Sequence, residues 1–305
     1  MPPALIAIDW GTSTARAYRL DTRGAILHRK SAPLGVQKVA AGGFPGALRV
    51  LLDGANDDVP LIACGMIGSR QGWIEAPYRA CPADFAMIAS ALTPVPGARL
   101  SIVPGLVCRD TAGIPDVMRG EETQIFGALD SPEAQDGARR VVVLPGTHSK
   151  WALVGAHGIE TFATFMTGEL YAVLREHSIL GRIATAGKDA AAVEQGVKRS
   201  LNADASLSHD LFSARTLALM SELAPEAVGD YLSGLLLGAE VAAGLRWLER
   251  HAAMGESVTL VGDAALCERY RRGLAIAGVD AMIGSPDAAA RGLWRIAQRA
   301  GMVGR

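Results

Sequence analysis

Short apolar runs separated by polar turns open the chain. Leu5 to Ile8 is an apolar run that ends at Asp9, and Ala15 to Leu20 alternates apolar residues with arginine. A third run, Ala25 to Arg29, follows a turn at Asp21 to Gly24. A period of two between turn residues is typical of paired strands. The pattern predicts a meander of three antiparallel strands, because each turn leads into a strand rather than a helix.

The same plan recurs near residue 141. Val141 to Leu144 is apolar, Pro145 to His148 has the composition of a turn, and strands are predicted at Trp151 to Val154 and Gly158 to Phe165. The two copies share this order of elements but little sequence. We interpret the recurrence as a duplicated fold with one copy in each of two domains.

Helical spacing dominates the second half of the chain, with apolar residues at roughly the 3.6-residue helical period. The predicted helices are Pro45 to Leu52, Met118 to Leu129, Gly168 to Glu176, Ala190 to Leu201, Leu211 to Met220, Tyr231 to His251, Ala264 to Gly278 and Asp287 to Arg299. Further strands are predicted at Leu61 to Cys64, Ile102 to Pro104 and Val258 to Val261. Mixed elements in this order predict an α/β fold. Because 305 residues exceed what one core usually serves, we expect domains at 1–128 and 129–305.

Composition and charge exclude several classes of protein. Half of the residues are apolar, the net charge is −1, and no basic stripe alternates with aromatics, so nucleic acid is not an expected partner. No apolar run approaches the roughly 18 residues of a membrane span, and the N-terminus has no basic region or cleavage site that would mark a targeting peptide. The four cysteines form no CxxC pair. This predicts free thiols in a cytoplasmic protein and no metal site built from them.

The first turn carries groups suited to binding phosphate. Asp9 ends the first strand, and Gly11, Thr12 and Ser13 follow in the turn. Backbone N–H groups and hydroxyls in such a turn can bind phosphate oxygens, and the carboxylate can hold Mg²⁺ directly or through water. The alternative is an ordinary hairpin with polar turn residues.

Two later turns offer similar chemistry. Gly146 and Thr147 form the second Gly-Thr turn, and Lys150 follows within reach of a phosphate. The turn is not a P-loop, because GxxxxGK[ST] is absent and no helix follows; His148 is interpreted as a turn residue rather than a base. Gly262 joins a strand to a helix, a junction that places backbone and a helix N-terminus beside a ligand. Each of these features also occurs in proteins without a phosphate ligand.

Two adjacent acids, Glu121 and Glu122, open the predicted central helix. Acids favour the first turn of a helix because of its dipole, which is the alternative to a catalytic role. Periodicity does not decide which of the two side chains points toward a substrate. Asp110, in a loop of undefined course, is a third candidate for a general base.

The order of these features resembles the plan of the actin-like ATPase and sugar-kinase superfamily. Seven runs resemble the 2-dehydro-3-deoxygalactonokinase family in particular: IAIDWGTSTARAY, GMIGSRQGWIEAPYRACPA, VPGL, VMRGEETQIFGAL, LPGTHSKW, FMTGEL and YLSGLL. They occur in family order from residue 6 to Leu236. The resemblance implies a two-domain, actin-like (ribonuclease H-like) fold, with a mixed sheet in each domain that opens with the three-strand meander.

The resemblance also implies a reaction. A cytoplasmic enzyme of galactonate catabolism would use ATP and Mg²⁺ to phosphorylate the terminal hydroxyl of 2-dehydro-3-deoxy-D-galactonate, giving the 6-phosphate and ADP. The N-terminal domain would carry the first phosphate turn and the sugar-acid loops. The C-terminal domain would carry the second phosphate turn and the adenosine turn. Small molecules are therefore the expected partners, and a homodimer is left open.

Roles follow residue by residue from the resemblance. The matched positions are Asp9 for the Mg²⁺-associated aspartate, Gly11 and Thr12 for the first phosphate turn, Gly146 and Thr147 for the second, and Gly262 for the adenosine turn. Glu121 follows Gly120, where related kinases place an aspartate base, and this favours Glu121 over Glu122. Within the glycine-rich loop from Gly65 to Tyr78, residues Ser69, Arg70, Gln71 and Trp73 are predicted near the sugar acid, as is Glu122. Arg70 is the predicted partner of the substrate carboxylate.

Two positions differ from the pattern of the superfamily, and two alternative functions are considered. Pro145 stands where many superfamily members carry an aspartate, and Asp263 stands where many carry a second glycine. Within the fold, the alternative is a kinase for another 2-keto-3-deoxy sugar acid. Outside kinases, the alternative is an ATP-switched binding protein. A Rossmann dehydrogenase is disfavoured, because no GxGxxG opens a helix after the first strand.

Overall fold

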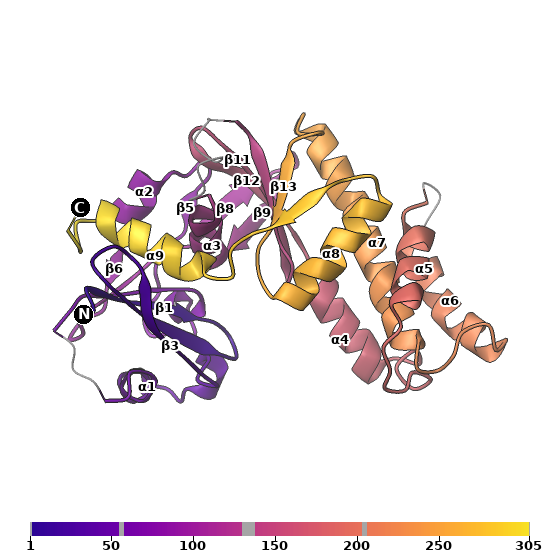
Figure 1. Cartoon of the computed structure of the whole chain (residues 1–305), viewed down its shortest axis with the longest axis horizontal. Helices are drawn as coiled ribbons and strands as arrows, with labels where there is room; N and C mark the ends of the chain where they lie inside the picture. The colour runs from indigo at the N-terminus through magenta and orange to yellow at the C-terminus, as the bar shows by residue number, and fades with distance from the viewer. Residues whose placement is uncertain (1, 55–57, 130–137, 203–205, 305) are drawn as a thin grey trace. The chain divides into compact units, whose positions relative to one another are not determined.

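The computed structural model describes residues 2–54, 58–129, 138–202 and 206–304 (Figure 1). The chain forms two compact units. The first comprises Met1–Ala138, Val154–Phe162 and Ser285–Arg305, and the second comprises Arg139–Leu153 and Ala163–Gly284. These units differ from the predicted division at 128/129, because the last helix and one short middle segment belong with the N-terminal residues.

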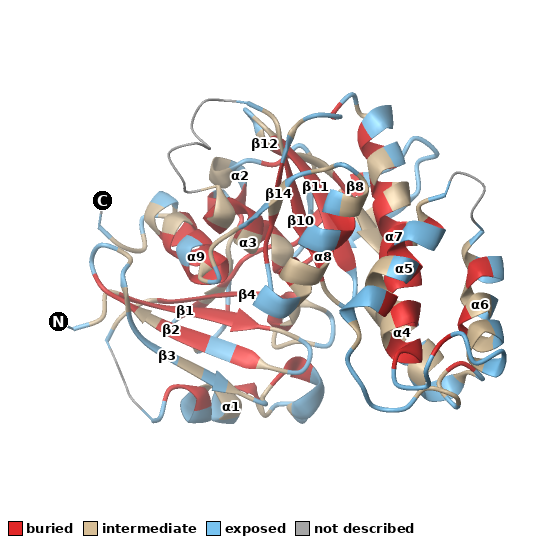
Figure 2. Cartoon of the chain, turned by 45° about the vertical axis from the view of Figure 1, so that its right-hand side comes forward, coloured by how far each residue is buried: buried red, intermediate tan, exposed pale blue. Residues whose placement is uncertain are grey.

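A six-stranded mixed sheet forms the centre of the first unit, in the order β3-β2-β1-β4-β7-β6. Its strands are β1 (Leu5–Trp10), β2 (Ala15–Leu20), β3 (Ile26–Ala32), β4 (Leu61–Cys64), β6 (Thr93–Pro94) and β7 (Leu100–Ile102). The first three strands pair antiparallel, whereas β1, β4 and β7 run parallel. All six residues of β1 are buried (Figure 2). Asp9 therefore lies inside a central strand rather than after it.

A second sheet of the first unit was not predicted. It contains β5 (Arg79–Ala80), β8 (Leu106–Arg109) and β9 (Pro115–Met118). Met118 pairs with Leu106 in this sheet, so the helix that was predicted to begin at Met118 begins only at Glu121. Between them, Gly120 has φ +108°, a conformation that favours glycine and separates strand from helix.

The helices of the first unit are α1 (Phe44–Leu51), α2 (Phe85–Ser90), α3 (Glu121–Ala128) and α9 (Ala288–Arg299). Helices α3 and α9 approach closely at two glycines. A Cβ atom on Gly127 would lie 1.8 Å from the carbonyl oxygen of Ala288, and one on Gly292 would lie 1.9 Å from that of Thr123. The small residues of α9 thus fix the position of α3.

The second unit contains the five-stranded sheet β12-β11-β10-β13-β14. Its strands are β10 (Arg140–Leu144), β11 (Ser149–Gly155), β12 (Gly158–Phe165), β13 (Ser257–Leu260) and β14 (Ala281–Ile283), of which β10, β13 and β14 run parallel. The tip of the β11–β12 hairpin, residues 154–162, belongs to the first unit, where Ile159 forms a bridge with Ala83.

The helices of the second unit are α4 (Thr167–His177), α5 (Ala190–Ser200), α6 (Leu207–Leu219), α7 (Val228–Arg250) and α8 (Ala264–Ile276). Among the described residues, α7 is the one helix that is long and apolar enough to cross a membrane, and 67% of its 18-residue apolar window is buried (Figure 2). Asp230, Glu240 and Arg246 interrupt the apolar residues of α7, so the helix contains no continuous apolar run of this length.

Candidate functional site

The turn between β1 and β2 has its carbonyl groups bound from one side. The carbonyl oxygens of Gly11, Thr12 and Ser13 accept hydrogen bonds from the backbone N–H groups of residues 36, 37 and 35, at 3.0, 3.1 and 3.2 Å. Gly35 permits this approach, since a Cβ atom there would lie 2.2 Å from the backbone of Ser13. The turn is therefore held rigidly by a neighbouring loop.

The N–H groups of the same turn have the opposite environment. No described residue accepts a hydrogen bond from the backbone N–H of Thr12 or Ser13, and both residues are exposed. Successive free N–H groups in a fixed turn attract anions. This geometry supports the predicted phosphate contact of Thr12 and Ser13, whereas the N–H of Gly11 donates to the carbonyl oxygen of Thr14 at 2.9 Å.

Asp9 lies next to this turn on β1 and is 9% exposed. Its Oδ2 atom accepts a hydrogen bond from Nη1 of Arg16 on β2 at 3.3 Å, while Oδ1 accepts none from any described residue. Burial raises the pKa of Asp9, and the charge of Arg16 opposes that rise. One free carboxylate oxygen suits Mg²⁺, which usually takes one or two carboxylates and completes its shell with phosphates and water.

Two glycines bring the start of α3 to the end of β1. Gly65, with φ +92°, would place a Cβ atom 2.7 Å from the carbonyl oxygen of Trp10, and a Cβ atom on Gly120 would lie 3.0 Å from the Cα of Gly65. Larger residues at either position would push the segments apart. The acids at the start of α3 consequently lie near Asp9.

The side chain of Cys64 lies near Asp9, Glu121 and Glu122. It is buried at the end of β4, and its pKa is raised well above the ordinary value, first by burial and then by the nearby carboxylates of Asp9 and Glu122. A thiol of this kind stays protonated and unreactive.

Glu121 and Glu122 have different environments. Glu122 is fully buried, and its carboxylate accepts hydrogen bonds from the N–H of Gly120 at 2.6 Å and from the hydroxyl of Thr123 at 2.9 Å. Burial is the main cause that raises the pKa of Glu122 to about 8, and the negative charge of Glu121 is the second. Glu121 is half-buried, and its Oε2 atom accepts a hydrogen bond from the N–H of Arg119 at 2.9 Å. Glu121 is the more accessible of the two, whereas Glu122 holds the start of the helix.

Asp110, the third acid considered, lies in the turn between β8 and β9. Its carboxylate accepts hydrogen bonds from the backbone N–H groups of Ala112 and Ile114, both at 2.9 Å. Such bonds are typical of an acid that stabilises a turn. The environment of Asp110 therefore explains its presence without a catalytic role.

The glycine-rich loop places its four candidate residues in different environments. Arg70 is 87% exposed and pairs with Glu75 at 3.1 Å, and Gln71 is also exposed. Trp73 is half-buried and stacks on Phe44, with 6.0 Å between ring centroids. The hydroxyl of Ser69 is buried, and no described residue bonds it. Trp73 thus anchors the loop to the core, and Arg70 is accessible to a ligand.

Arg119 is a candidate residue that the sequence analysis missed. It is only 8% exposed, donates from Nη2 to the carbonyl oxygen of Ala76 at 2.8 Å, and stacks over Tyr78 at 4.3 Å from the ring centroid. Its Nε and Nη1 atoms have no hydrogen-bond partner among the described residues, and no described carboxylate forms an ion pair with it. A buried guanidinium without an acid partner is costly. Its place two residues before Glu121 in MRGEETQ was the available signal.

The second Gly-Thr turn is packed against the start of α4. The N–H of Glu169 donates to the carbonyl oxygen of Thr147 at 3.0 Å, and a Cβ atom on Gly168 would lie 2.4 Å from the carbonyl oxygen of Gly146. His148 hydrogen-bonds the carboxylate of Glu169. Thr147 is exposed, so its side chain remains accessible to a phosphate.

Lys150 is more buried than its position beside a hairpin suggested. It is 5% exposed, and its Nζ atom donates to the hydroxyl of Thr164 on β12 at 2.9 Å. The predicted contact with phosphate stays a prediction.

Gly262 follows β13 with φ +146°, and a Cβ atom there would lie 3.4 Å from the carbonyl oxygen of Pro145. The predicted adenosine turn therefore lies next to the predicted second phosphate turn. Asp263 caps α8, accepting hydrogen bonds from the N–H groups of Ala265 and Leu266 at 3.0 Å each. The sequence predicted that this junction places the helix N-terminus beside a ligand. However, these two N–H groups are already bonded to Asp263, so they are not available to an anion.

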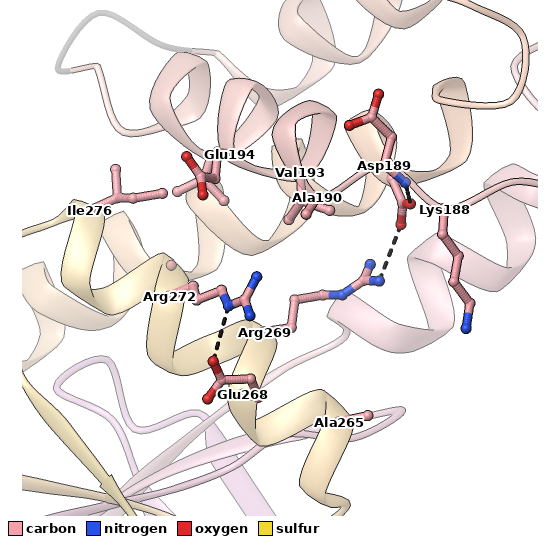
Figure 3. A pocket seen from close by; sticks show the side chains of 13 residues that line it. Lys188, Asp189, Ala190, Val193, Glu194, Ala265, Glu268, Arg269, Arg272 and Ile276 are labelled. Carbon is pink, nitrogen blue, oxygen red and sulfur yellow. Dashed lines mark hydrogen bonds and ion pairs between the residues drawn. The ribbon is translucent and has the colours of Figure 1, made fainter.

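A cavity of about 300 Å³ lies between α5 and α8 in the second unit (Figure 3). Its apolar wall includes Val193, Val197 and Ile276, and Ala265 lines it near the start of α8. Arg269 crosses it and pairs with Asp230 at 3.1 Å. Its lining comes from helices distant in sequence, so no local motif could have predicted it.

Among the described residues, no group of three or more His, Cys, Asp or Glu side chains is placed to hold a metal ion. A metal at Asp9 would therefore take most of its ligands from elsewhere, as Mg²⁺ bound to a nucleotide does.

Comparisons with known proteins give a consistent result. The family model of 2-keto-3-deoxy-galactonokinase matches residues 9–296. A probable 2-dehydro-3-deoxygalactonokinase of Rhizobium meliloti (strain 1021) is 38% identical, over 94% of this chain and 97% of that protein. The 2-dehydro-3-deoxygalactonokinase of Escherichia coli (strain K12) is 36% identical, over 95% of both chains.

Solved structures extend the comparison to the fold. A Sinorhizobium meliloti protein assigned as a 2-dehydro-3-deoxygalactonokinase superposes with a TM-score of 0.86 at 36% identity, over 96% of this chain and 98% of that one. The activator of 2-hydroxyisocaproyl-CoA dehydratase from Clostridium difficile, solved with bound ADPNP, reaches 0.53 at 12% identity, over 97% and 96% of the chains. The second likeness shows the α/β, actin-like fold alone. The first, with the family model and the relatives, confirms the expected kinase family: this chain belongs to the 2-dehydro-3-deoxygalactonokinases.

Proposed function

We propose that the chain transfers the terminal phosphoryl group of ATP, with Mg²⁺, to the 6-hydroxyl of 2-dehydro-3-deoxy-D-galactonate, giving the 6-phosphate and ADP. The observation that carries the proposal is the turn at Thr12 and Ser13. Its carbonyl oxygens accept hydrogen bonds, the N–H groups of Thr12 and Ser13 have no acceptor among the described residues, and Asp9 lies next to it. Phosphoryl transfer depends mainly on positioning and on neutralising charge, which such a group supplies.

The nucleotide would contact several predicted residues. Gly11, Thr12, Ser13, Gly146, Thr147 and Lys150 would hold the phosphates, and Gly262 would support the adenosine. The cavity beside Ala265 offers an apolar wall against which the adenine base could pack, and the side chain of Arg269 also lines this cavity. Proximity of Gly262 to Pro145 supports this arrangement, because phosphates and adenosine belong to one molecule.

Mg²⁺ would be held by the free Oδ1 atom of Asp9 together with phosphate oxygens and water. Bound there, it would neutralise charge on the transferred group. Arg16 keeps Asp9 oriented through its other carboxylate oxygen.

Glu121 is the proposed general base. A primary hydroxyl is a poor nucleophile, and a positioned carboxylate can take its proton as the bond to phosphorus forms. Glu121 is the accessible acid at the start of α3, whereas Glu122 is fully buried.

The substrate carboxylate would be recognised by arginine. Arg70 is exposed at the glycine-rich loop, and Arg119 lies under that loop without an acid partner among the described residues. Ser69, Gln71 and Trp73 would shape the same loop, and Glu122 would support it indirectly through Gly120.

A coupled assay of ADP release tests the proposal. We expect release that depends on added 2-dehydro-3-deoxy-D-galactonate, and much slower release with the gluconate-derived epimer. Faster turnover with the epimer would favour the alternative kinase. Slow hydrolysis that no sugar acid accelerates would favour an ATP-switched binding protein.

The proposal includes a cytoplasmic location in a galactonate catabolic route, with small molecules as the partners, and with no nucleic acid or membrane. It also keeps the two-domain organisation, with one phosphate turn in each unit. Sedimentation of the purified enzyme would decide whether it is a homodimer.

A further inference from the structure

A buried carboxylate in the second unit connects elements that the proposed reaction uses. Glu240 lies on α7 and is 3% exposed. Its Oε1 atom accepts a hydrogen bond from Nε1 of Trp151 at 2.9 Å, and its Oε2 atom accepts one from the hydroxyl of Tyr270 at 2.7 Å. Trp151 lies on β11, and Tyr270 lies on α8.

The hydrogen bonds continue from Tyr270 to the second phosphate turn. The hydroxyls of Tyr270 and Ser149 are 2.8 Å apart, and the N–H of Gly146 approaches the Ser149 hydroxyl at 3.4 Å. The hydroxyl of Tyr270 donates its one proton to Glu240, so Ser149 is the donor in the bond between Ser149 and Tyr270. The oxygen of Ser149 is then free to accept from Gly146. One carboxylate therefore orients every donor in the chain of bonds.

A second connection reaches the same turn from its other side. The side chain of Thr167, the first residue of α4, also hydrogen-bonds Glu240. Two residues later, the N–H of Glu169 holds the carbonyl oxygen of Thr147. Burial raises the pKa of Glu240, and the hydrogen bonds from Thr167, Tyr270 and Trp151 oppose that rise.

Gly244, one turn further along α7, allows this packing. A Cβ atom there would lie 2.7 Å from the indole ring of Trp151. The ring can therefore lie close to the backbone of α7, with its N–H donating to Glu240.

We propose that Glu240 is a positioning residue for nucleotide binding, which fixes the phosphate turn at Gly146 and Thr147 relative to helix α8 after Gly262. The inference rests on the proposed use of ATP. Phosphates and adenosine are bound at these two places in that proposal, and they are joined covalently. A change in the distance between the turn at Gly146 and Thr147 and the start of α8 would weaken the binding of the whole nucleotide.

Calorimetric titration with Mg²⁺-ADP tests the inference. Tyr270→Phe removes the hydroxyl and keeps the ring, and Glu240→Gln keeps the shape of the side chain but replaces one acceptor with a donor. We expect the Kd for ADP to rise by about tenfold in each, the equivalent of about 1.4 kcal/mol. In steady-state assays, KM for ATP should rise while KM for the sugar acid stays within about twofold of the parent.

Asp210→Asn is the matched control. Asp210 is another buried carboxylate of the second unit, 3% exposed and paired with Arg199 at 2.9 Å, and no described contact joins it to either turn. It should lower the melting temperature and leave the Kd for ADP unchanged. If Glu240 contributes to stability alone, Tyr270→Phe should behave like Asp210→Asn, with a lower melting temperature and an unchanged Kd for ADP. An unchanged Kd for ADP in Tyr270→Phe would overturn the inference.

Two further outcomes are decisive. If Glu240→Gln does not fold, Tyr270→Phe and Ser149→Ala decide, since both leave the carboxylate in place and interrupt the same chain of bonds. A parent enzyme that binds no ADP would overturn the proposed use of ATP and this inference with it. A parent that binds ADP, with all three variants binding it equally well, would overturn this inference alone.

Discussion

The N–H of Gly120 donates a hydrogen bond to the carboxylate of Glu122 over 2.6 Å, in a fully buried environment. Burial raises the pKa of Glu122 from 4.5 to about 8, so the folded chain holds a proton there that the unfolded chain releases. The proton on Glu122 therefore contributes fully to the free energy of unfolding below about pH 4.5. This contribution is lost as the pH rises through about 8, at up to about 1.4 kcal/mol per pH unit.

We therefore expect Glu122→Gln to reduce the loss of stability between pH 5 and pH 8, because the amide resembles the protonated acid. The free energy of unfolding, measured by urea titration across that range, checks this. The variant should gain roughly 2–4 kcal/mol on the parent between the two ends of the range. Parallel curves for parent and variant would show that Glu122 is ionised in the folded chain.

Replacing Glu121 with glutamine should remove the proposed base while keeping the bond to the N–H of Arg119. We expect kcat to fall by roughly 10²–10⁴-fold, with little change in the affinity for ATP. Asp110→Asn is the comparison variant, since the hydrogen bonds of its carboxylate to described residues lie within its own turn. Turnover of Glu121→Gln within a few-fold of the parent would transfer the role to another acid.

Arg119 should be required in its own chemical form. Lysine cannot both donate to Ala76 and stack on Tyr78 with a planar group. We expect Arg119→Lys to raise KM for the sugar acid by about tenfold or more and to leave KM for ATP nearly unchanged. Initial rates at varied concentrations of each substrate measure this. An equal rise in both values would indicate a general loss of structure.

Arg70 gives a weaker expectation because it is exposed and already paired with Glu75. Arg70→Ala should raise KM for the sugar acid, by less than Arg119→Lys does. If Arg70→Ala has the larger effect, the exposed arginine binds the carboxylate and Arg119 supports the loop. No change in KM would remove Arg70 from the site.

Asp9→Asn should keep the fold and lose most turnover at ordinary Mg²⁺ concentration. The amide is a poorer ligand for Mg²⁺, although Arg16 keeps its place beside it. Because burial raises the pKa of Asp9, activity should also fall on acidification at a higher pH than an ordinary aspartate would cause. A titration of rate against Mg²⁺ at two pH values measures both effects. A variant that is saturated at the Mg²⁺ concentration of the parent would contradict the assignment.

Local pattern was sufficient for several of the regular elements. The predicted strands Ala15 to Leu20, Leu61 to Cys64 and Gly158 to Phe165 have the bounds observed for β2, β4 and β12, because turn residues flank each of them. The predicted α8 and α9 also begin within one residue of their observed starts. The β8–β9 hairpin was missed, since its strands are short and β9 starts with Pro115.

The environment of charged residues needed tertiary structure. Glu121 and Glu122 are adjacent and chemically alike, yet Glu121 is half-buried and Glu122 is fully buried. Arg119 is buried by Ala76 and Gly68, about 50 residues earlier in the chain. Such distant contacts decide which ionisable group is enclosed, and the local sequence carries no record of them.

The place of α9 in the first unit has a consequence for how the chain is made. The ribosome releases the N-terminal strands first, yet α9, the helix that packs on α3, is synthesised after the whole second unit. The second unit is inserted between them and is complete once residue 284 has emerged. The inserted unit can therefore fold during synthesis, whereas the unit that carries Asp9 and Glu121 is completed only after α9 has been synthesised.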